Sequence, residues 1–165
     1  MRLIERDALM TRALAVLTIS AAALLATSAV AQDHALVLTG VGRFAIFADV
    51  ASVTPDGAPA SASVRMRSLQ VSEEDMVIGD AAYVGGWSWW RFDCAAQTAD
   101  RLDFASLKAD GTEGPITPTK SAPYAVSPGG DAAELAAVAC GAEARAIDAV
   151  STAEAVRIGR ERMQD

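Results

Sequence analysis

The sequence has few of the side chains on which much enzyme and metal chemistry depends. Its 165 residues include one histidine and two cysteines. Most chemistry that pairs a nucleophile with an imidazole base is therefore excluded, as is every zinc site built from several cysteine and histidine ligands. Aromatic residues make up 5% of the chain, so we expect a modest core with few large side chains.

Basic residues are also scarce. The chain has 14 lysines and arginines against 21 aspartates and glutamates, a formal net charge of −7. The first 31 residues hold three of the basic and two of the acidic residues, so the remainder has 11 against 19, a net charge of −8. Such an acidic surface repels a phosphate backbone, and nucleic acid is not an expected partner.

The N-terminus has the three parts of a bacterial Sec-type signal peptide. Three arginines lie within Met1–Arg12, an uncharged apolar run covers Ala13–Ala26, and Ala29–Ala31 supplies the small residues that a signal peptidase needs. We predict cleavage between Ala31 and Gln32. The alternative is an uncleaved anchor, because the uncharged stretch 13–31 has 19 residues and barely reaches the length that spans a bilayer.

Cleavage would leave 134 residues, the size of one domain, in the periplasm or outside the cell. No cysteine lies near the cleavage site, so the mature protein would have no lipid anchor and would be soluble. Because that compartment is oxidising, Cys94 and Cys140 are interpreted first as a structural disulfide and second as free thiols. The sequence predicts no particular oligomeric state.

Alternation of apolar and polar residues predicts an antiparallel sheet with one solvated side. A turn at Thr54–Pro59 divides residues 35–69 into a hairpin, and the polar run Ser72–Asp75 is expected to form an exposed bend. Gly79–Gly86 is predicted to be a loop or a short irregular segment. Further strands are expected at residues 87–94 and 101–107, followed by an extended edge region spaced by Pro115, Pro118 and Pro123.

Two helices are predicted near the C-terminus. Ser127-Pro128 is a suitable start for the first, which continues through residues 134–140 and stops at Gly141. Ser151 and Glu154 form a capping box for the second, expected over Thr152–Met163. The alanine-rich side of the second helix buries little area, so the tail 142–165 is predicted to be a separable appendage that docks weakly on the domain 32–141.

Short motifs at the predicted turns, strand ends and helix start point to a family. They are Asp49 with Ser52-Val53 ahead of the Asp56-Gly57 turn, Phe92-Asp93-Cys94, Asp110-Gly111, and Tyr124-x-Val126-x-Pro128-Gly129 with Glu134 and Cys140. From Val37 to Gly141 the chain resembles the surface-adhesin protein E family of exported bacterial proteins. The resemblance implies an antiparallel sheet crossed by a helix, a disulfide joining the two, and binding without known catalysis. Named members of the family bind host extracellular-matrix proteins.

The strand predicted at residues 87–94 carries the candidate binding residues. Its pleat sends alternate side chains to opposite faces, with Trp90, Phe92 and Cys94 on one and Trp87, Trp89 and Arg91 on the other. If the disulfide ties Cys94 to a helix over the core, then Trp87, Trp89 and Arg91 face outward, where they would bind a protein or glycan or mediate self-association. The alternative is that the C-terminal tail or the opposite rim covers the tryptophans.

One metal site is a candidate. Cleavage after Ala31 would place His34 third in the mature chain, after Gln32 and Asp33. The free amine, two backbone amides and the imidazole would then close a square-planar site of the kind that copper(II) and nickel(II) favour. The alternative is that the single histidine falls there by chance, or that the N-terminal glutamine cyclises and removes the amine.

The acidic residues give a weaker indication of chemistry. Asp93, Asp100 and Asp103 are close in sequence, but aspartates at strand ends are usually solvated, and the neighbouring Arg91 and Arg101 neutralise them.

Taken together, these features of the sequence predict an exported α+β domain, an antiparallel sheet with a C-terminal helix stapled by one disulfide, acting as a non-enzymatic binding or adhesin-like module. The first rival hypothesis is a periplasmic copper- or nickel-binding protein, and the second is an enzyme that works through carboxylates.

Overall fold

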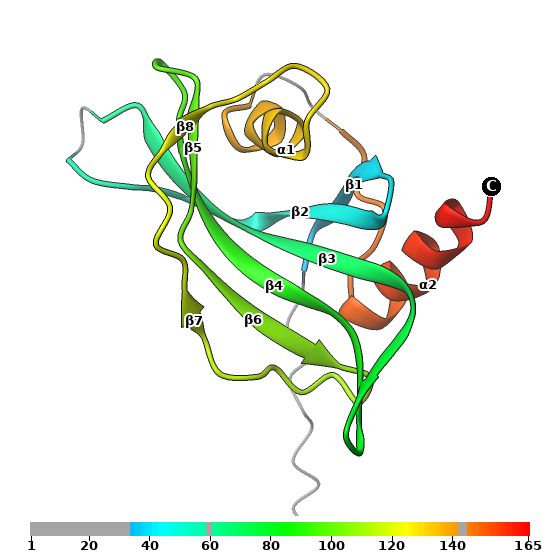
Figure 1. Cartoon of the computed structure of the whole chain (residues 1–165). Helices are drawn as coiled ribbons and strands as arrows, with labels where there is room; N and C mark the ends of the chain where they lie inside the picture. The colour runs from blue at the N-terminus through cyan, green and yellow to red at the C-terminus, as the bar shows by residue number, and fades with distance from the viewer. Residues whose placement is uncertain (1–33, 59–60, 142–144) are drawn as a thin grey trace, which may run out of the picture. The chain divides into compact units, whose positions relative to one another are not determined.

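The computed structural model describes residues 34–58, 61–141 and 145–165. These residues form eight strands and two helices, and all the strand pairs are antiparallel (Figure 1). The elements are β1 Leu36–Val41, β2 Phe44–Pro55, β3 Ser63–Ile78, β4 Ala81–Asp93, β5 Thr98–Arg101, β6 Asp103–Lys108, β7 Thr117–Pro118, β8 Tyr124–Ala125, α1 Asp131–Ala139 and α2 Thr152–Met163. The predicted α+β fold class is confirmed.

The strands follow the order β1-β2-β3-β4-β5-β8, and β6 pairs with both β4 and β7. The hairpin predicted within residues 35–69 corresponds to β2 and β3, in which Ala45 lies opposite Val71. The single strand predicted at residues 101–107 is instead divided at Leu102, because β5 and β6 pair with different parts of β4. The short edge strands β7 and β8 lie in the proline-rich region, as expected for segments with few free amide donors.

The hairpin of β3 and β4 is longer than the sequence predicted. Ser72–Asp75 lies inside β3 and not at a bend, and most of Gly79–Gly86 belongs to β4 and not to a loop. In the distal part, residues 76–78 pair with residues 81–83; the side chains of the β3 residues are exposed and those of the β4 residues are partly buried. Alternation of apolar residues fails to predict such a segment, because backbone pairing holds it together without a buried face.

Gly85 marks a register shift in the middle of this hairpin. Its φ is 152°, and a Cβ at this position would collide with the backbone carbonyl of Gln70, so only glycine fits. Because the shift precedes Trp87, the alternation of side chains from Trp87 to Asp93 is uninterrupted. The predicted division of the tryptophans between two faces of the sheet is confirmed.

One face of the sheet is covered by α1. Leu135 and Val138 of this helix join a buried cluster whose strand residues include Ile46, Ala48, Met66 and Phe92. α1 begins at Asp131 and not at Ser127-Pro128, since Gly129 has a φ of 78° and Gly130 is the N-cap. The first turn therefore starts three residues later than the cap signal in the sequence indicated.

The other face is covered by α2 and the segment that precedes it, so that Figure 1 shows the two helices separated by strands of the sheet. α2 has the predicted bounds, and Ser151 accepts a hydrogen bond from the amide of Glu154 at 3.3 Å. Ala149 and Ala155 belong to the buried core together with Leu36, Phe47, Leu69, Val71 and Trp87. The tail is thus part of the core and not a peripheral appendage, because its small residues let the helix approach the sheet closely.

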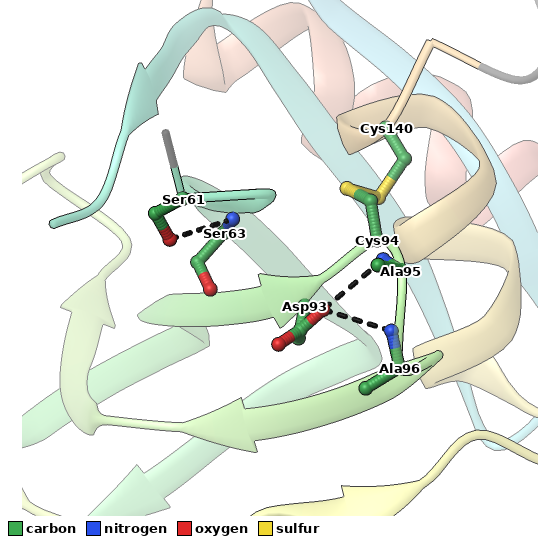
Figure 2. Close-up of a disulfide and its surroundings, with 7 residues drawn as sticks. All are labelled: Ser61, Ser63, Asp93, Cys94, Ala95, Ala96 and Cys140. Atoms are coloured by element: carbon green, nitrogen blue, oxygen red, sulfur yellow. Dashed lines mark hydrogen bonds between the residues drawn. A yellow bond between two sulfur atoms is a disulfide. The ribbon is translucent and has the colours of Figure 1, made fainter. Parts of the chain in front are cut away.

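The predicted disulfide joins Cys94 to Cys140, with the Cα atoms 5.7 Å apart (Figure 2). It links the turn after β4 to the residue that ends α1. In that turn the Asp93 carboxylate accepts hydrogen bonds from the amides of Ala95 and Ala96, at 3.0 and 2.8 Å. The bond thus fixes the C-terminal end of α1 against the sheet.

The predicted signal peptide and its cleavage position lie outside the described residues. Among the residues that the structure describes, no helix is long and apolar enough to cross a membrane.

Candidate functional site

A cleft of about 330 Å³ lies between the N-terminal end of α1 and the sheet. We call it the α1 cleft, and it is lined by Ile46, Ser68, Gln70, Ser88, Trp90, Arg101, Tyr124, Ser127, Gly130, Asp131, Ala132 and Leu135. Its volume is at the lower end of the range of about 300–1,000 Å³ for small-molecule sites. A second cleft of about 310 Å³, beside the disulfide, has Asp93 as its single charged side chain.

The floor of the α1 cleft is hollow because small polar residues meet across two strands. Ser68 and Ser88 are direct partners in β3 and β4, and both are buried. The Ser68 hydroxyl accepts a hydrogen bond from the Trp90 indole at 2.9 Å, and the Ser88 hydroxyl accepts one from Nε of Arg101 at 2.9 Å. Each serine therefore holds a neighbouring side chain in place and keeps its own O–H for donation.

Arg101 supplies the positive charge of the cleft. Its guanidinium carbon lies 5.2 Å from the centre of the Phe104 ring and 6.0 Å from that of Trp90, within the range of cation–π attraction. Burial lowers the pKa of Arg101, and the negative charge of Asp103 offsets part of this effect. Within the described part of the chain, Arg101 makes no salt bridge and its Nη groups make no hydrogen bond. A permanently protonated, half-buried cation thus faces the cleft, and no described carboxylate lies within salt-bridge distance of it.

The N-terminal end of α1 forms the opposite wall. Its N-cap, Gly130, has no side chain to accept hydrogen bonds from the first turn. The amides of Asp131 and Ala132 have no acceptor among the described residues, and they carry the partial positive charge of a helix N-terminus. The carboxylate of Asp131 also lines the cleft; one of its oxygens lies 3.5 Å from where a Cβ on Gly40 would stand, toward β1.

Tyr124 lies at the open side of the cleft, on the edge strand β8. Partial burial raises the pKa of its phenol, while the charge of Arg101 acts in the opposite direction. The phenol is therefore a neutral hydrogen-bond donor at neutral pH. Within the described residues, neither this hydroxyl nor the side-chain amide of Gln70 makes a hydrogen bond.

The predicted binding residues lie on the other face of the sheet, away from the cleft. Trp87 is only 2% exposed, so the expectation that it faces solvent is wrong. The ring of His34 stacks on it at 5.0 Å, and the guanidinium carbon of Arg67 lies 4.4 Å from its ring centre. The alternative considered from the sequence, that the C-terminal tail or the opposite rim covers the tryptophans, describes Trp87 better, because Trp87 shares a buried cluster with Ala149 and Ala155 of the tail.

Trp89 and Arg91 continue this face toward the end of β4. Trp89 is half-buried, with the guanidinium carbon of Arg65 at 5.2 Å from its ring centre. Arg91 is exposed but forms ion pairs with Asp56 at 2.5 Å and with Asp100 at 3.7 Å. Trp89 and Arg91 therefore both contact charged side chains of the protein itself. Their role in binding stays a prediction.

Two of the three predicted metal ligands, Gln32 and Asp33, lie outside the described residues. Nδ1 of His34 is 2.8 Å from a carboxylate oxygen of Asp49, and the His34 amide donates to the carbonyl of Val150 at 3.3 Å. In the predicted metal site, His34 would bind the ion through its Nδ1 and its backbone nitrogen, which are the two atoms engaged in these contacts. Copper or nickel binding at His34 therefore requires both contacts to break. No group of three metal-ligating side chains occurs within residues 34–58, 61–141 and 145–165.

The three aspartates considered for catalysis have separate structural roles. Asp93 binds two amides of its own turn, and Asp103 accepts a hydrogen bond from the amide of Trp89 at 2.8 Å. Asp100 is buried beside Arg91. Each carboxylate thus holds a strand end or a cation in place.

Sequence reasoning missed the residues of the α1 cleft, above all Arg101, Tyr124 and Ser88. One signal was available, since Ser68 shares the inward-facing side of its strand with Met66. A buried serine among apolar residues indicates a polar partner across the sheet. Identifying that partner requires the register of three strands, which the sequence does not give.

No protein-family model matches this sequence, and no curated protein matches it. The resemblance to the surface-adhesin protein E family stays a prediction.

Proposed function

We propose that this protein is an exported, non-enzymatic binding module of the periplasm or cell surface, which holds its ligand in the α1 cleft. The observation that carries the proposal is how the side chain of Arg101 is held in the cleft. Its Nε is fixed by Ser88 and its planar group is flanked by Trp90 and Phe104, while its outer nitrogens make no hydrogen bond or salt bridge with any residue that the structure describes. A side chain held in position with its donors unused is suited to binding a ligand with little loss of conformational entropy.

The contacts around the cleft favour binding over catalysis. The hydroxyls of Ser68 and Ser88 contact Trp90 and Arg101, which are not bases. The single imidazole of the chain, on His34, stacks on Trp87 at the opposite face of the sheet. Export is supported by the disulfide, which persists in oxidising compartments.

A fragment screen by ¹H–¹⁵N NMR on the oxidised protein tests this function. We expect bound fragments to shift the Trp90 indole and Arg101 Nε resonances and to be recovered chemically unchanged. The Trp89 indole, on the opposite face, is the internal control and should not move. A library in which no fragment shifts Trp90 and Arg101, or in which the shifts gather around Trp89, would overturn the proposal.

A further inference from the structure

The charges around the α1 cleft restrict the class of ligand, and the inference drawn from them rests on the proposed function. We propose that the cleft binds a small organic monocarboxylate, with its carboxylate at the Nη groups of Arg101 and its apolar body against Trp90 and the neighbouring apolar wall.

The geometry of Arg101 suits a carboxylate. Nε is occupied by Ser88, which leaves the two Nη groups as a planar pair of donors. Such a pair matches the two oxygens of a carboxylate, and charge-assisted hydrogen bonds of this kind are stronger than neutral ones. The unpaired amides of Asp131 and Ala132 at the start of α1 add partial positive charge on the other side of the cleft.

The surrounding acidic groups disfavour a ligand with two negative charges. Among the described residues that line the cleft, Arg101 is the single basic one, whereas Asp131 also lines it and Asp103 acts on Arg101 electrostatically. The chain as a whole has a net charge of −7. A phosphate dianion would meet one cation against this background, so a single negative charge is the better match.

The rest of the lining indicates an apolar body of limited size. Ile46, Ala132 and Leu135 line the cleft together with the Trp90 ring. A volume of about 330 Å³ accepts a phenyl ring or a short alkyl chain, but not an extended polymer. The Trp90 ring offers a flat surface for stacking, and its indole N–H is already bonded to Ser68.

Calorimetry with matched ligand pairs tests the proposal on the unmodified protein. The probes are phenylacetate with phenylacetamide, and hexanoate with hexanamide, which differ in charge but hardly in shape. We expect each acid to bind at least about tenfold more tightly than its amide, the difference typical of a hydrogen bond to a charged group. Inorganic phosphate should not displace phenylacetate. Equal affinities within both pairs, or displacement by phosphate at equal concentration, would overturn the proposal.

Variants of Arg101 test the residue itself. In Arg101→Gln the preference for acid over amide should fall to about one, while Arg101→Lys should keep part of it, because the charge remains and the planar pair of donors is lost. Arg65→Gln, on the opposite face, is the matched control and should keep the full preference. The ratio is measured within one variant, so a change in stability does not imitate the effect. An unchanged ratio in Arg101→Gln would assign the preference to another group.

The outcomes separate this proposal from the proposed function. Acids and amides that bind equally and both shift the Trp90 indole would leave the α1 cleft as a binding site and remove the preference for a carboxylate. Probes and fragments that all fail to shift Trp90 would remove both.

Discussion

The three tryptophans of β4 lie within four positions of one another and occupy three different environments. Trp87 is buried under His34 and Arg67, Trp89 is half-buried beside Arg65, and Trp90 lines the α1 cleft. The pleat of the strand separates Trp90 from the other two. Trp87 differs from Trp89 because residues distant in sequence cover it. Residue type and alternation therefore predict the face of the sheet on which a tryptophan lies, but not how far its side chain is exposed.

We expect Trp87→Ala to lower the free energy of unfolding by about 3–5 kcal/mol, because the side chain is almost completely buried and leaves a cavity. Trp89→Ala should cost less, since part of that ring is already in contact with water. Urea unfolding of the two variants and the parent measures the difference. Equal losses would show that the two rings contribute alike to the core.

Tyr124 gives a prediction of pH dependence. Its folded-state pKa is raised by partial burial, so the neutral phenol is favoured in the folded protein. The stability contributed by this group is fully present below the ordinary pKa of tyrosine and is lost as the pH rises through the raised value. Titration of tyrosinate absorbance should show one component above the ordinary range, absent from Tyr124→Phe. A variant with an unchanged titration curve would contradict the assignment.

Among the elements, α2 follows most directly from the sequence. Ser151 and Glu154 define its start through local hydrogen bonds, and its bounds are those predicted. The β3–β4 hairpin and the α1 cleft were not predicted, because they depend on pairs far apart in the chain. Ser68 meets Ser88 only through the register of β3 with β4, and Trp90 meets Arg101 only through that of β4 with β5.

The packing of α2 reverses the usual effect of glycine in a helix. Alanine is favoured over glycine by about 1 kcal/mol at an exposed helix position. A Cβ on Gly159, however, would lie 2.8 Å from the Cβ of Ala45 and 3.1 Å from the ring of Phe47. We therefore expect Gly159→Ala to destabilise the protein by about 1–3 kcal/mol, as overpacked cores do.

Thermal or urea unfolding checks this expectation, and Arg157 provides the control. Arg157 is exposed on the same helix, where Arg157→Ala should be more stable than Arg157→Gly by about 1 kcal/mol. A stabilising Gly159→Ala would show that the helix can move away from the sheet without cost.

The disulfide connects the turn after β4 to the C-terminal end of α1. It closes a loop with a sequence separation of 46, which by loop entropy in the unfolded state corresponds to about 4 kcal/mol. We expect Cys94→Ser with Cys140→Ser to unfold at a clearly lower urea concentration than the oxidised parent. The reduced parent should match the double variant. Identical midpoints for the oxidised and reduced parent would contradict the prediction.

In the molecule as a whole, the C-terminal segment is a structural component of the core. Removal of residues 142–165 would take away the cover of a buried cluster that includes Leu36, Phe47 and Leu69. We expect the truncated protein to lose cooperative unfolding and to bind an apolar dye. Removal of Gln164 and Asp165 alone, which follow α2, is the control and should have little effect. A truncated protein that melts like the parent would show that the sheet needs cover on one face only.

The order of elements along the chain has a consequence for biogenesis. All the described strands are complete by Ala125, whereas the helices that cover them begin at Asp131 and Thr152. A polypeptide emerges from its N-terminal end at about 5–20 residues per second, so the sheet-forming segments are present for seconds before their cover exists. During that interval the apolar faces of the sheet are available to other nascent chains. Cys94 also lacks Cys140, with which it forms the disulfide. Productive folding of this protein therefore waits until α2 has been made, and a holding chaperone would act before that point.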